Sequence, residues 1–303
     1  MQIGIGLPTR TADAPPAVLL AMAARAEAGP FSSLAVADRV VFPAQEPLIA
    51  LAAVVGITRR IRLMTSALLG PTRETTLLAR QAATLDALSG GRFSLGLGIG
   101  VREDDYAATG FPFRERGRRL EWQLAELRRA WSGEGEAEGR ARTIGARPAR
   151  PGGPELLIGG YVDAVARRIA TWGDGFIAPG GGEPARMVEL WARIRAAWQA
   201  AGRDGQPRWV GASYFALGPS ATDLARGHID AWYGFDPALA ERRLATIPAT
   251  PEAVRAAIDR QRGMGVDEFV LRPCAADLDQ VDRLADLVDG LSGGRPGSPA
   301  GVG

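Results

Sequence analysis

The chain of 303 residues contains no lysine, a single cysteine (Cys274) and a single histidine (His228). The missing lysine excludes Schiff-base chemistry and a lysine general base. A single cysteine cannot form an intrachain disulfide. One cysteine and one histidine are also too few ligands for a Cys/His zinc site. A Ser-His-Asp triad would have to be centred on His228. A chain this poor in catalytic side chains is typical of an enzyme whose cofactor supplies the chemistry.

Long apolar runs and clustered charges are missing too. No apolar segment reaches the ~18 residues that a membrane-spanning helix needs, and the N-terminal run MQIGIGLPTR has none of the features of a secretory signal. The net charge is +2 and the arginines are spread among acidic residues, so no nucleic-acid partner is expected. We therefore expect a cytoplasmic protein that acts on a small molecule, with no membrane partner.

The most strongly patterned stretch of the chain reads as strand, helix, strand. Ile61–Leu69 is an apolar, β-rich run closed by Gly70-Pro71, which is typical of a buried strand. Apolar residues then recur at helical spacing until Gly90-Gly91, where glycine can adopt the left-handed conformation that ends a helix. Arg92–Gly100 predicts the second strand.

The second of these strands has two unlike faces. Alternation places bulky residues on one face and small ones on the other, Phe93, Leu95, Leu97 and Ile99 against Ser94, Gly96, Gly98 and Gly100. A bare face allows a flat ligand to approach the backbone, and it equally suits tight packing against a neighbouring strand. A dinucleotide-binding fingerprint is excluded, because Val101 stands where its third glycine is required.

Strand-like segments alternate with helical ones along the whole chain and predict an α/β fold, a (β/α)8 TIM barrel. A doubly wound parallel sheet is the second possibility. The predicted strands are Gln2–Leu7, Ser33–Ala37, Ile61–Leu69, Arg92–Gly100, Leu156–Gly159, Gly175–Ala178, Trp209–Leu217 and Glu268–Leu271. A single domain is expected over residues 1–291, followed by a disordered tail at 292–303.

Insertions are expected after the fourth and the seventh predicted strand. The least patterned segments, which should line a substrate pocket, are Val101–Phe113, Ser132–Pro154 and Gly218–Ala249. Ser132–Pro154 is rich in glycine, arginine and proline, and we interpret it as a surface excursion or a flexible lid.

Loops at the carboxyl ends of the strands form the active site of such a barrel. The catalytic candidates are Asp38 and Arg39, together with His228 from a helix after Trp209–Leu217. The cofactor-binding candidates are Thr65, Ser66, Ala67, Gly98, Gly100, Asp104, Gly159, Gly160, Tyr161, Gly180 and Gly181. Arg272 could reach a phosphate or form a surface ion pair, and Cys274 is interpreted as a buried, inert thiol. No metal site is expected.

The turn Gly159-Gly160 precedes a helix that we expect to begin near Asp163. Free N–H groups of such a turn and of the helix N-terminus favour the binding of a phosphate. The same residues also suit an ordinary turn in which Asp163 caps the helix. Residue types alone leave both interpretations open.

Three runs of the sequence resemble the bacterial luciferase-like flavin-dependent oxidoreductases. They are LARQAATLDALSGGRFSLGLGIG, TGFPFRERGRRLEW and LLIGGYVDAVARRIATWGDGF, in the order and with the spacing of that family. The resemblance implies a cofactor phosphate at Gly159-Gly160-Tyr161. It also implies a bulge with a non-prolyl cis peptide under the flavin ring within Thr65-Ser66-Ala67, and we place that bond between Ser66 and Ala67.

The family often has Asp-His where this chain has Asp38-Arg39. A histidine there acts as a base or hydrogen-bond donor near the ring, whereas an arginine stabilises an anion and cannot act as a base near pH 7. Arg39 is therefore expected either to contact the substrate or to form a salt bridge with an aspartate at a loop. His228 is interpreted as a structural residue or, alternatively, as a general base at the barrel rim.

The resemblance implies an oxidoreductase and leaves three functions open. The first is a monooxygenase that uses O2 and reduced FMN, supplied by a separate flavin reductase, on a small organic substrate. The second is a coenzyme F420-dependent oxidoreductase of the same fold, which transfers hydride. The third is a non-catalytic flavin-binding relative. The family also implies a homodimer.

Overall fold

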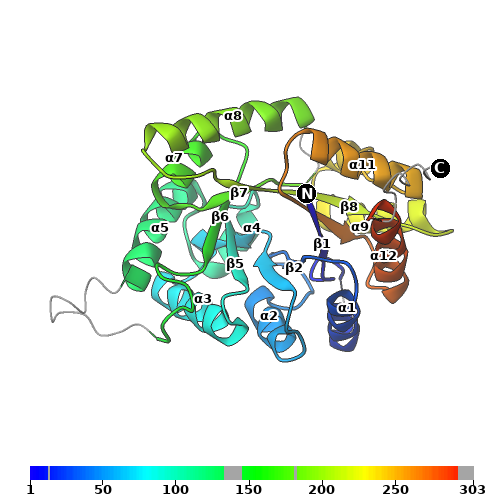
Figure 1. The fold of residues 1–303 in the computed structure, drawn as a ribbon, viewed down its shortest axis with the longest axis horizontal. Coiled ribbons are helices and arrows are strands. Elements are labelled where there is room, and N and C mark those ends of the chain that lie inside the picture. Colours follow the sequence, from blue (N-terminus) through cyan, green and yellow to red (C-terminus); the bar gives the residue numbers. More distant parts are fainter. Residues whose placement is uncertain (13, 133–144, 181–182, 293–303) are drawn as a thin grey trace, which may run out of the picture.

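The chain folds into a closed barrel of parallel strands surrounded by helices (Figure 1). The computed structural model describes residues 1–12, 14–132, 145–180 and 183–292. The strands are β1 (Gln2–Gly6), β2 (Ser33–Val36), β3 (Arg62–Thr65), β4 (Leu68–Leu69), β5 (Phe93–Gly98), β6 (Glu155–Gly159), β7 (Gly175–Ile177), β8 (Arg208–Phe215) and β9 (Glu268–Pro273).

The strand order is β3-β2-β1-β9-β8-β7-β6-β5-β4, and an additional pairing of β3 with β5 closes the sheet. Every paired neighbour runs parallel. This closure confirms the (β/α)8 barrel, and it excludes the doubly wound sheet, which would leave two edges unpaired.

Strands β3 and β4 share one position in the barrel, where the sequence predicted the single strand Ile61–Leu69. Met64 pairs with Ser94 of β5, whereas Leu68 pairs with Leu97. Four steps on one strand therefore face three on the other, which is the count of a β-bulge. The bulge contains the cis peptide bond Ser66–Ala67. Both the bulge and the position of the cis bond were predicted, and both are confirmed.

Helices lie between successive strands and form the outer layer (Figure 1). They are α1 (Pro16–Ala28), α2 (Pro47–Val55), α3 (Thr75–Ser89), α5 (Arg116–Ser132), α7 (Ala164–Trp172), α8 (Pro184–Ala200), α11 (Pro251–Gly263) and α12 (Leu278–Ser292). Among the residues that the structure describes, no helix combines the length and apolarity that crossing a bilayer requires.

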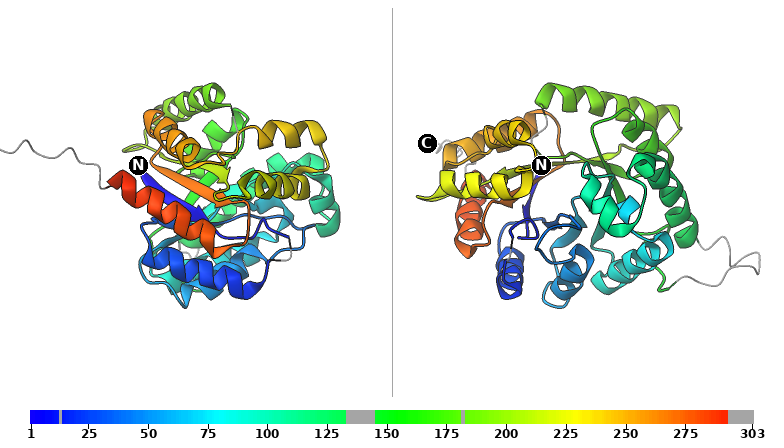
Figure 2. Two further views of the ribbon diagram at one scale, coloured as in Figure 1. Left: turned by 90° about the vertical axis from the view of Figure 1, so that its right-hand side faces the viewer. Right: turned by 180° about the vertical axis from the view of Figure 1, so that it is seen from behind.

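Additional helices follow two strands. These are α4 (Glu103–Thr109) with the 3-10 turn η2 (Phe113–Glu115) after β5, and α9 (Ala221–Tyr233) with α10 (Pro237–Leu244) after β8; a further 3-10 turn, η1 (Gly70–Thr72), follows β4. Figure 2 shows α9 and α10, in yellow, standing beyond one end of the barrel. Because they follow the last residue of a strand, that end is the carboxyl end, which we call the mouth.

Helix α3 shows how local sequence fixes an element. The Glu74 carboxylate accepts hydrogen bonds from the backbone N–H groups of Thr76, at 3.0 Å, and Leu77, at 2.6 Å, and so caps the first turn. Leu78 is buried on the inner face. Gly90 ends the helix with φ of 66°, a conformation that favours glycine. The predicted helix and its predicted end are confirmed.

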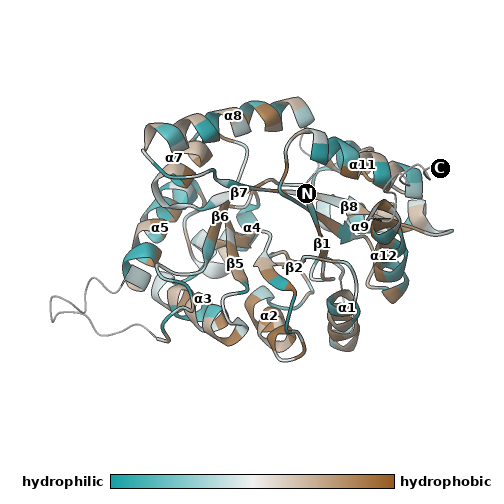
Figure 3. Cartoon of the chain, in the orientation of Figure 1, coloured by the Kyte–Doolittle hydropathy of each residue, from teal (hydrophilic) through white to brown (hydrophobic). Residues whose placement is uncertain are grey.

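The hydrophobic core lies mainly between the strands and the helices. Figure 3 shows apolar residues on the strands and a mixture of apolar and polar residues on the helices, as amphipathic helices on a barrel require. A smaller cluster fills the barrel itself, and its members are Ala35, Met64, Leu157, Ile177, Val210, Ala212 and Val270.

Charged residues close the amino end of the barrel. Glu155 accepts from Arg208 at 2.6 Å and from Arg62 at 2.9 Å, and Arg208 also pairs with the fully buried Glu268. Burial opposes ionisation of Glu155, but Arg208, the Ser94 hydroxyl and Arg62 outweigh it and hold its pKa below the ordinary value. We call Arg62, Glu155, Arg208 and Glu268 the ionic plug.

The glycine face of β5 turns into the barrel, and Gly96 on it is required for packing. A Cβ atom at Gly96 would lie 2.1 Å from the carbonyl oxygen of Thr65. The Thr65 hydroxyl also donates to the Gly96 carbonyl at 2.8 Å. At Gly98 a Cβ would lie 3.4 Å from that of Ala67, an ordinary contact. Tight packing is therefore the correct interpretation at Gly96, while Gly98 faces the mouth beside the bulge.

Two expectations about the chain outline need correction. Helix α12 extends through Ser292, so the helical part ends one residue later than predicted; the tail at 293–303 lies outside the described residues. The segment Ser132–Pro154 is no lid in its described part, because it leads from α5 into the amino end of β6. There the backbone N–H of Arg150 donates to Asp86 of α3 at 3.1 Å. The described residues 145–154 therefore lie opposite the mouth.

Candidate functional site

The mouth is bordered by segments that follow several strands. The Ser66–Ala67 bulge interrupts β3 and β4, the turn Gly159–Tyr161 follows β6, and Gly180 follows β7. The last predicted glycine, Gly181, lies outside the described residues. These predicted residues thus lie together at the mouth, and their individual contacts decide what each can do.

Arg272 forms the floor of the mouth. It is 94% buried, with 6% of its surface exposed, and its Nη2 donates to the carbonyl oxygen of Ser66 at 2.9 Å and to the Ser66 hydroxyl. Its Cγ lies 2.9 Å from where a Cβ of Gly6 would stand, so only glycine leaves room for it. The predicted surface ion pair of Arg272 is wrong. The side chain instead ties the last strand to the bulge.

Asp38 holds the other side of the bulge. Its buried carboxylate accepts hydrogen bonds from the Leu69 N–H and from Nη2 of Arg73, both at 2.9 Å. The hydrogen bond to the Leu69 N–H holds the backbone just after Ser66–Ala67 in place, and Arg73 neutralises the carboxylate. Asp38 therefore acts in this structure as a positioning residue, and its predicted catalytic role stays a prediction.

Arg39 joins the loop after β2 to α4 and α9. Its guanidinium lies 3.5 Å from the carboxylate of Asp105 and 3.6 Å from that of Asp104, and it donates to the Val41 carbonyl at 2.8 Å. Its charged group also lies 5.4 Å from the ring centroid of Trp232. The aspartate contact expected for Arg39 is present. A substrate contact of Arg39 stays a prediction.

The predicted residues after β5 belong to this same loop network. Asp104 pairs with Arg102, and that hydrogen bond holds the pKa of Asp104 below its ordinary value. Gly100 has φ of 66°, and a Cβ there would lie 2.9 Å from the Leu69 side chain. Asp104 is thus committed to arginines of its own loop, and Gly100 is required by the turn.

His228 is buried beside Tyr214, whose ring centroid lies 4.9 Å away. Burial, with Arg10 and Arg272 nearby, lowers the pKa of His228 to about 3. Its Nε2 has no hydrogen-bond partner among the described residues. A histidine with this pKa is neutral near pH 7 and a weak base. The geometry places it at the mouth, but the general-base role stays a prediction.

The turn after β6 is open. Gly160 has φ of 148°, and a Cβ there would lie 2.9 Å from Val165. The Asp163 side chain caps none of the first N–H groups of α7 and pairs with Arg193 instead. The capped-turn interpretation is therefore wrong. The N–H groups of Val165 and Ala166 donate to the carbonyls of Val162 and Asp163, at 2.9 and 3.0 Å, so the glycine backbone before the helix is the part of the turn that suits an anion.

Tyr161 and Gly180 meet next to this turn. Arg243 of α10 donates from Nη2 to the Tyr161 hydroxyl at 3.0 Å and from Nη1 to the Gly180 carbonyl. Burial raises the pKa of Tyr161, so the phenol stays neutral. The structure thus brings two predicted residues together through a third, Arg243, that the sequence did not select.

Two arginines of the mouth were missed. Arg10 follows β1, so the strand-end rule applied to that strand would have found it. Arg243 lies on α10, a helix beyond β8, and nothing in its local sequence marks it. Cys274, in contrast, is buried as predicted, and burial raises its thiol pKa to about 12.

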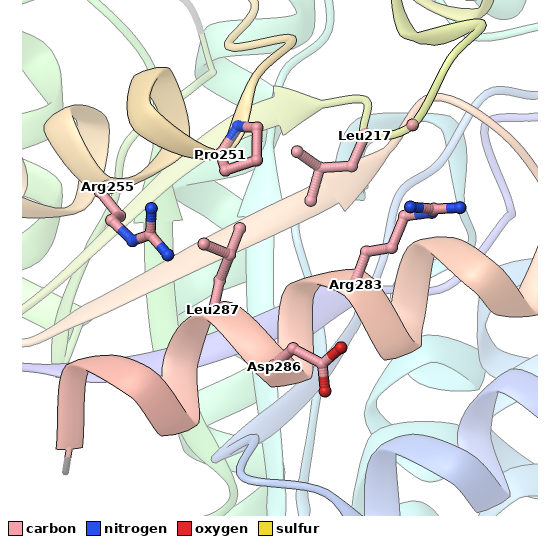
Figure 4. Close-up of a pocket in the computed structure, with 7 residues that line it drawn as sticks. Leu217, Pro251, Arg255, Arg283, Asp286 and Leu287 are labelled. Atoms are coloured by element: carbon pink, nitrogen blue, oxygen red, sulfur yellow. The ribbon is translucent and has the colours of Figure 1, made fainter.

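A separate cavity of about 240 Å³ lies between the residues just after β8 and helices α11 and α12 (Figure 4). Leu217, Pro251 and Leu287 form its apolar wall, and Arg255, Arg283 and Asp286 lie at its rim. No predicted site residue lines it. The cavity is therefore distinct from the group of candidate residues at the mouth.

A sequence model of one protein family, described as luciferase-like monooxygenase, matches residues 1–290 of the chain. The chain belongs to this family. The match covers nearly the whole barrel and confirms the resemblance that three short runs of sequence had indicated.

Two curated proteins resemble this chain in sequence. An uncharacterised protein of Mycobacterium tuberculosis is 30% identical over 208 residues, covering 60% of this chain and 72% of that protein. The F420-dependent glucose-6-phosphate dehydrogenase of Intrasporangium calvum is 37% identical over 136 residues, covering 41% of this chain and 40% of that protein.

Solved structures extend the comparison of the fold. The monooxygenase RslO1 from Streptomyces bottropensis matches with a TM-score of 0.76 at 21% identity, covering 96% of this chain and 98% of that one. An F420-dependent secondary alcohol dehydrogenase in complex with an F420-acetone adduct matches with a TM-score of 0.75 at 18% identity, with the same coverage. These two likenesses concern the fold alone.

Proposed function

We propose that this luciferase-like family member is an oxidoreductase that binds the ring system of reduced FMN or of coenzyme F420 at the mouth of its barrel. The observation that carries this proposal is the open turn after β6 in a chain that matches the family over residues 1–290. A Cβ at Gly160 would fill the turn, and no side chain caps the helix that follows. These features fit a phosphate.

The residues have distinct roles in this proposal. Gly159, Gly160 and the N-terminus of α7 hold the cofactor phosphate, while the Ser66–Ala67 bulge and Gly98 lie under the ring. The bound cofactor supplies the redox chemistry. Asp38 and Arg272 keep the bulge in place from its two sides through the hydrogen bonds described above.

A monooxygenase that uses reduced FMN and O2 is the first candidate, supported by the description of the family. It would receive reduced flavin from a separate reductase. An F420-dependent hydride-transfer enzyme is the second candidate, supported by the 37% identity to the F420-dependent dehydrogenase over 136 residues. Association as a homodimer is part of both proposals.

Titration of the purified chain with FMN, reduced FMN and F420, followed by calorimetry, tests the proposal. Binding of reduced FMN, with O2 consumption once a reductase and substrate candidates are added, supports the monooxygenase. Preference for F420 supports hydride transfer. Binding without turnover of any substrate would favour the non-catalytic relative. Dissociation constants above about 1 mM for all three, or about −4 kcal/mol, would contradict the proposal.

A further inference from the structure

Three arginines at the mouth lack an acidic partner among the described residues, whereas the buried Arg168 pairs with Glu121 at 3.0 Å. Arg10, Arg243 and Arg272, which we call the arginine cluster, form no ion pair with a described residue. At the opposite end of the barrel, Arg62 and Arg208 both pair with Glu155, at 2.9 and 2.6 Å. The arginine cluster therefore gathers positive charge without an acidic partner in the described part of the chain, whereas the arginines of the ionic plug are paired.

The members of the arginine cluster converge on one place. Arg243 donates to the Gly180 carbonyl, and a Cβ at Gly180 would lie 3.1 Å from Nη1 of Arg272. Arg10 lies over the ring of Trp232, 4.3 Å from its centroid. The Nε and Nη1 atoms of Arg10 are buried and have no hydrogen-bond partner among the described residues.

Tyrosines complete the wall around the arginine cluster. The Tyr161 hydroxyl accepts from Arg243 at 3.0 Å, and the hydroxyls of Tyr214 and Tyr233 lie 2.9 Å apart. Arg10 lies 5.2 Å from the centroid of the Tyr214 ring. These phenols offer hydrogen bonds and aromatic faces but no negative charge near pH 7.

Burying a cation without a counter-charge costs free energy, and this cost lowers the pKa of the buried group. Burial, together with repulsion from Arg272 and Arg243, lowers the pKa of Arg10 to about 9. Burial lowers the pKa of Arg272 to about 10. A carboxylate or a phosphate relieves this repulsion, and the guanidinium group binds both in a bidentate geometry.

We propose that the arginine cluster recognises an oxyanion group of the substrate, a carboxylate or a phosphate. The inference rests on the proposed oxidoreductase function and adds the chemical class of the substrate to it. Arg243 contacts Tyr161, next to the turn proposed for the cofactor phosphate, whereas Arg10 lies on the far side of the barrel from that turn. Arg10 follows β1, and in the closed order β1 lies four positions from β6 in either direction.

His228 provides a probe, because it is the only histidine in the chain and lies beside Tyr214. The cofactor-free protein, without a histidine tag, is titrated with inorganic phosphate and separately with benzoate at constant ionic strength, while the imidazole NMR signals are recorded. We expect a saturable shift. Arg243→Met and Arg272→Met each weaken anion binding by at least about tenfold. Arg242→Met, at the exposed neighbouring position on α10, leaves it unchanged.

No saturable shift with either anion, or an equal weakening in Arg242→Met, overturns the anion site. Because Arg272 is buried in the floor of the mouth, Arg272→Met could fail to fold. In that case the anion affinity of Arg243→Met alone is compared with that of Arg242→Met. Repeating the titration with bound reduced FMN or F420 separates the sources of the oxyanion. Retained binding supports the substrate, whereas competitive loss assigns the cluster to the cofactor phosphate and overturns the proposal.

The two proposals fail in different ways. If neither cofactor binds, the proposed oxidoreductase function and the substrate role fail together, but a saturable, Arg243-dependent shift still establishes the anion site. If a cofactor binds and the shift is absent, only the substrate inference fails.

Discussion

At the scale of single residues, position 39 shows how one change redirects a site. Where the family often has histidine, Arg39 lies between Asp104 and Asp105 of α4 and the ring of Trp232. Arginine cannot accept a proton near pH 7. The base of any reaction at this mouth must therefore come from another residue or from the bound molecules, and His228 is the titratable side chain whose environment is easiest to test.

We predict that His228 weakens the folded state in mild acid. Its pKa in the folded state is about 3, against about 6.5 in an unfolded chain. Between these values the unfolded chain binds the proton, so the free energy of unfolding falls as pH falls, by up to about 1.4 kcal/mol per pH unit. Urea unfolding at pH 7 and pH 5 should show a larger loss for the native chain than for His228→Gln.

The imidazole NMR signals provide the control for this prediction. They should not titrate between about pH 5 and pH 8. An ordinary midpoint near 6.5, or equal acid sensitivity of the two chains, would show that His228 is accessible to water rather than buried as a neutral group.

At the scale of elements, the turn between β6 and α7 distinguishes a ligand site from an ordinary connection. A helix cap from Asp163 or a side chain at position 160 would each have blocked an anion from this turn. Asp163 could have capped the helix, but its carboxylate pairs with Arg193, and position 160 carries no side chain. An element whose first N–H groups are left without a side-chain cap suits an anionic ligand.

We predict that Gly160→Ala weakens binding of the cofactor by at least about tenfold, because the added Cβ would lie 2.9 Å from Val165 and φ of 148° strains an alanine. The matched control is Gly152→Ala, which also has positive φ, 78°, with no atom near its added Cβ. Calorimetric titration of both variants measures the difference. Equal losses would mean that backbone strain alone, and not the turn, lowers the affinity.

At the scale of the whole molecule, the two ends of the barrel have opposite electrostatics. The amino end is closed by the ionic plug, in which acidic and basic groups alternate, while the mouth carries the arginine cluster without acidic partners among the described residues. Under the proposed function, stability and ligand binding would belong to separate ends, as in other barrels of this kind.

We predict that Glu155→Gln lowers the free energy of unfolding by about 3 kcal/mol, because it leaves Arg208 and Arg62 partly unpaired. The depressed pKa of Glu155 means that its contribution is present above about pH 4.3 and is lost as pH falls below that value. Binding of the cofactor should be unchanged. Urea unfolding at pH 7 and pH 3.5 measures both effects.

Glu115→Gln is the control, since it removes a solvent-exposed ion pair with Arg118 and should change stability by less than about 0.5 kcal/mol. If Glu155→Gln lowered the free energy of unfolding as little as Glu115→Gln does, the ionic plug would not be a source of stability.

The sequence predicted what local chemistry determines. Apolar periodicity located the strands, and Gly90 marked the end of α3. It could not predict the arginine cluster, because Arg10, Arg243 and Arg272 come from distant parts of the chain and meet only once the barrel closes. The lid interpretation of Ser132–Pro154 fails for its described residues 145–154 for a topological reason, because they lead into the amino end of β6 whatever their composition.

The most direct measurement of the central claim is a crystal structure of the chain with whichever cofactor binds more tightly, reduced FMN or F420. The account predicts the cofactor phosphate at Gly159-Gly160 and the N-terminus of α7, with the ring over the Ser66–Ala67 bulge and the arginine cluster facing the remaining space. A cofactor bound elsewhere, or a phosphate held by Arg10 and Arg272, would contradict it.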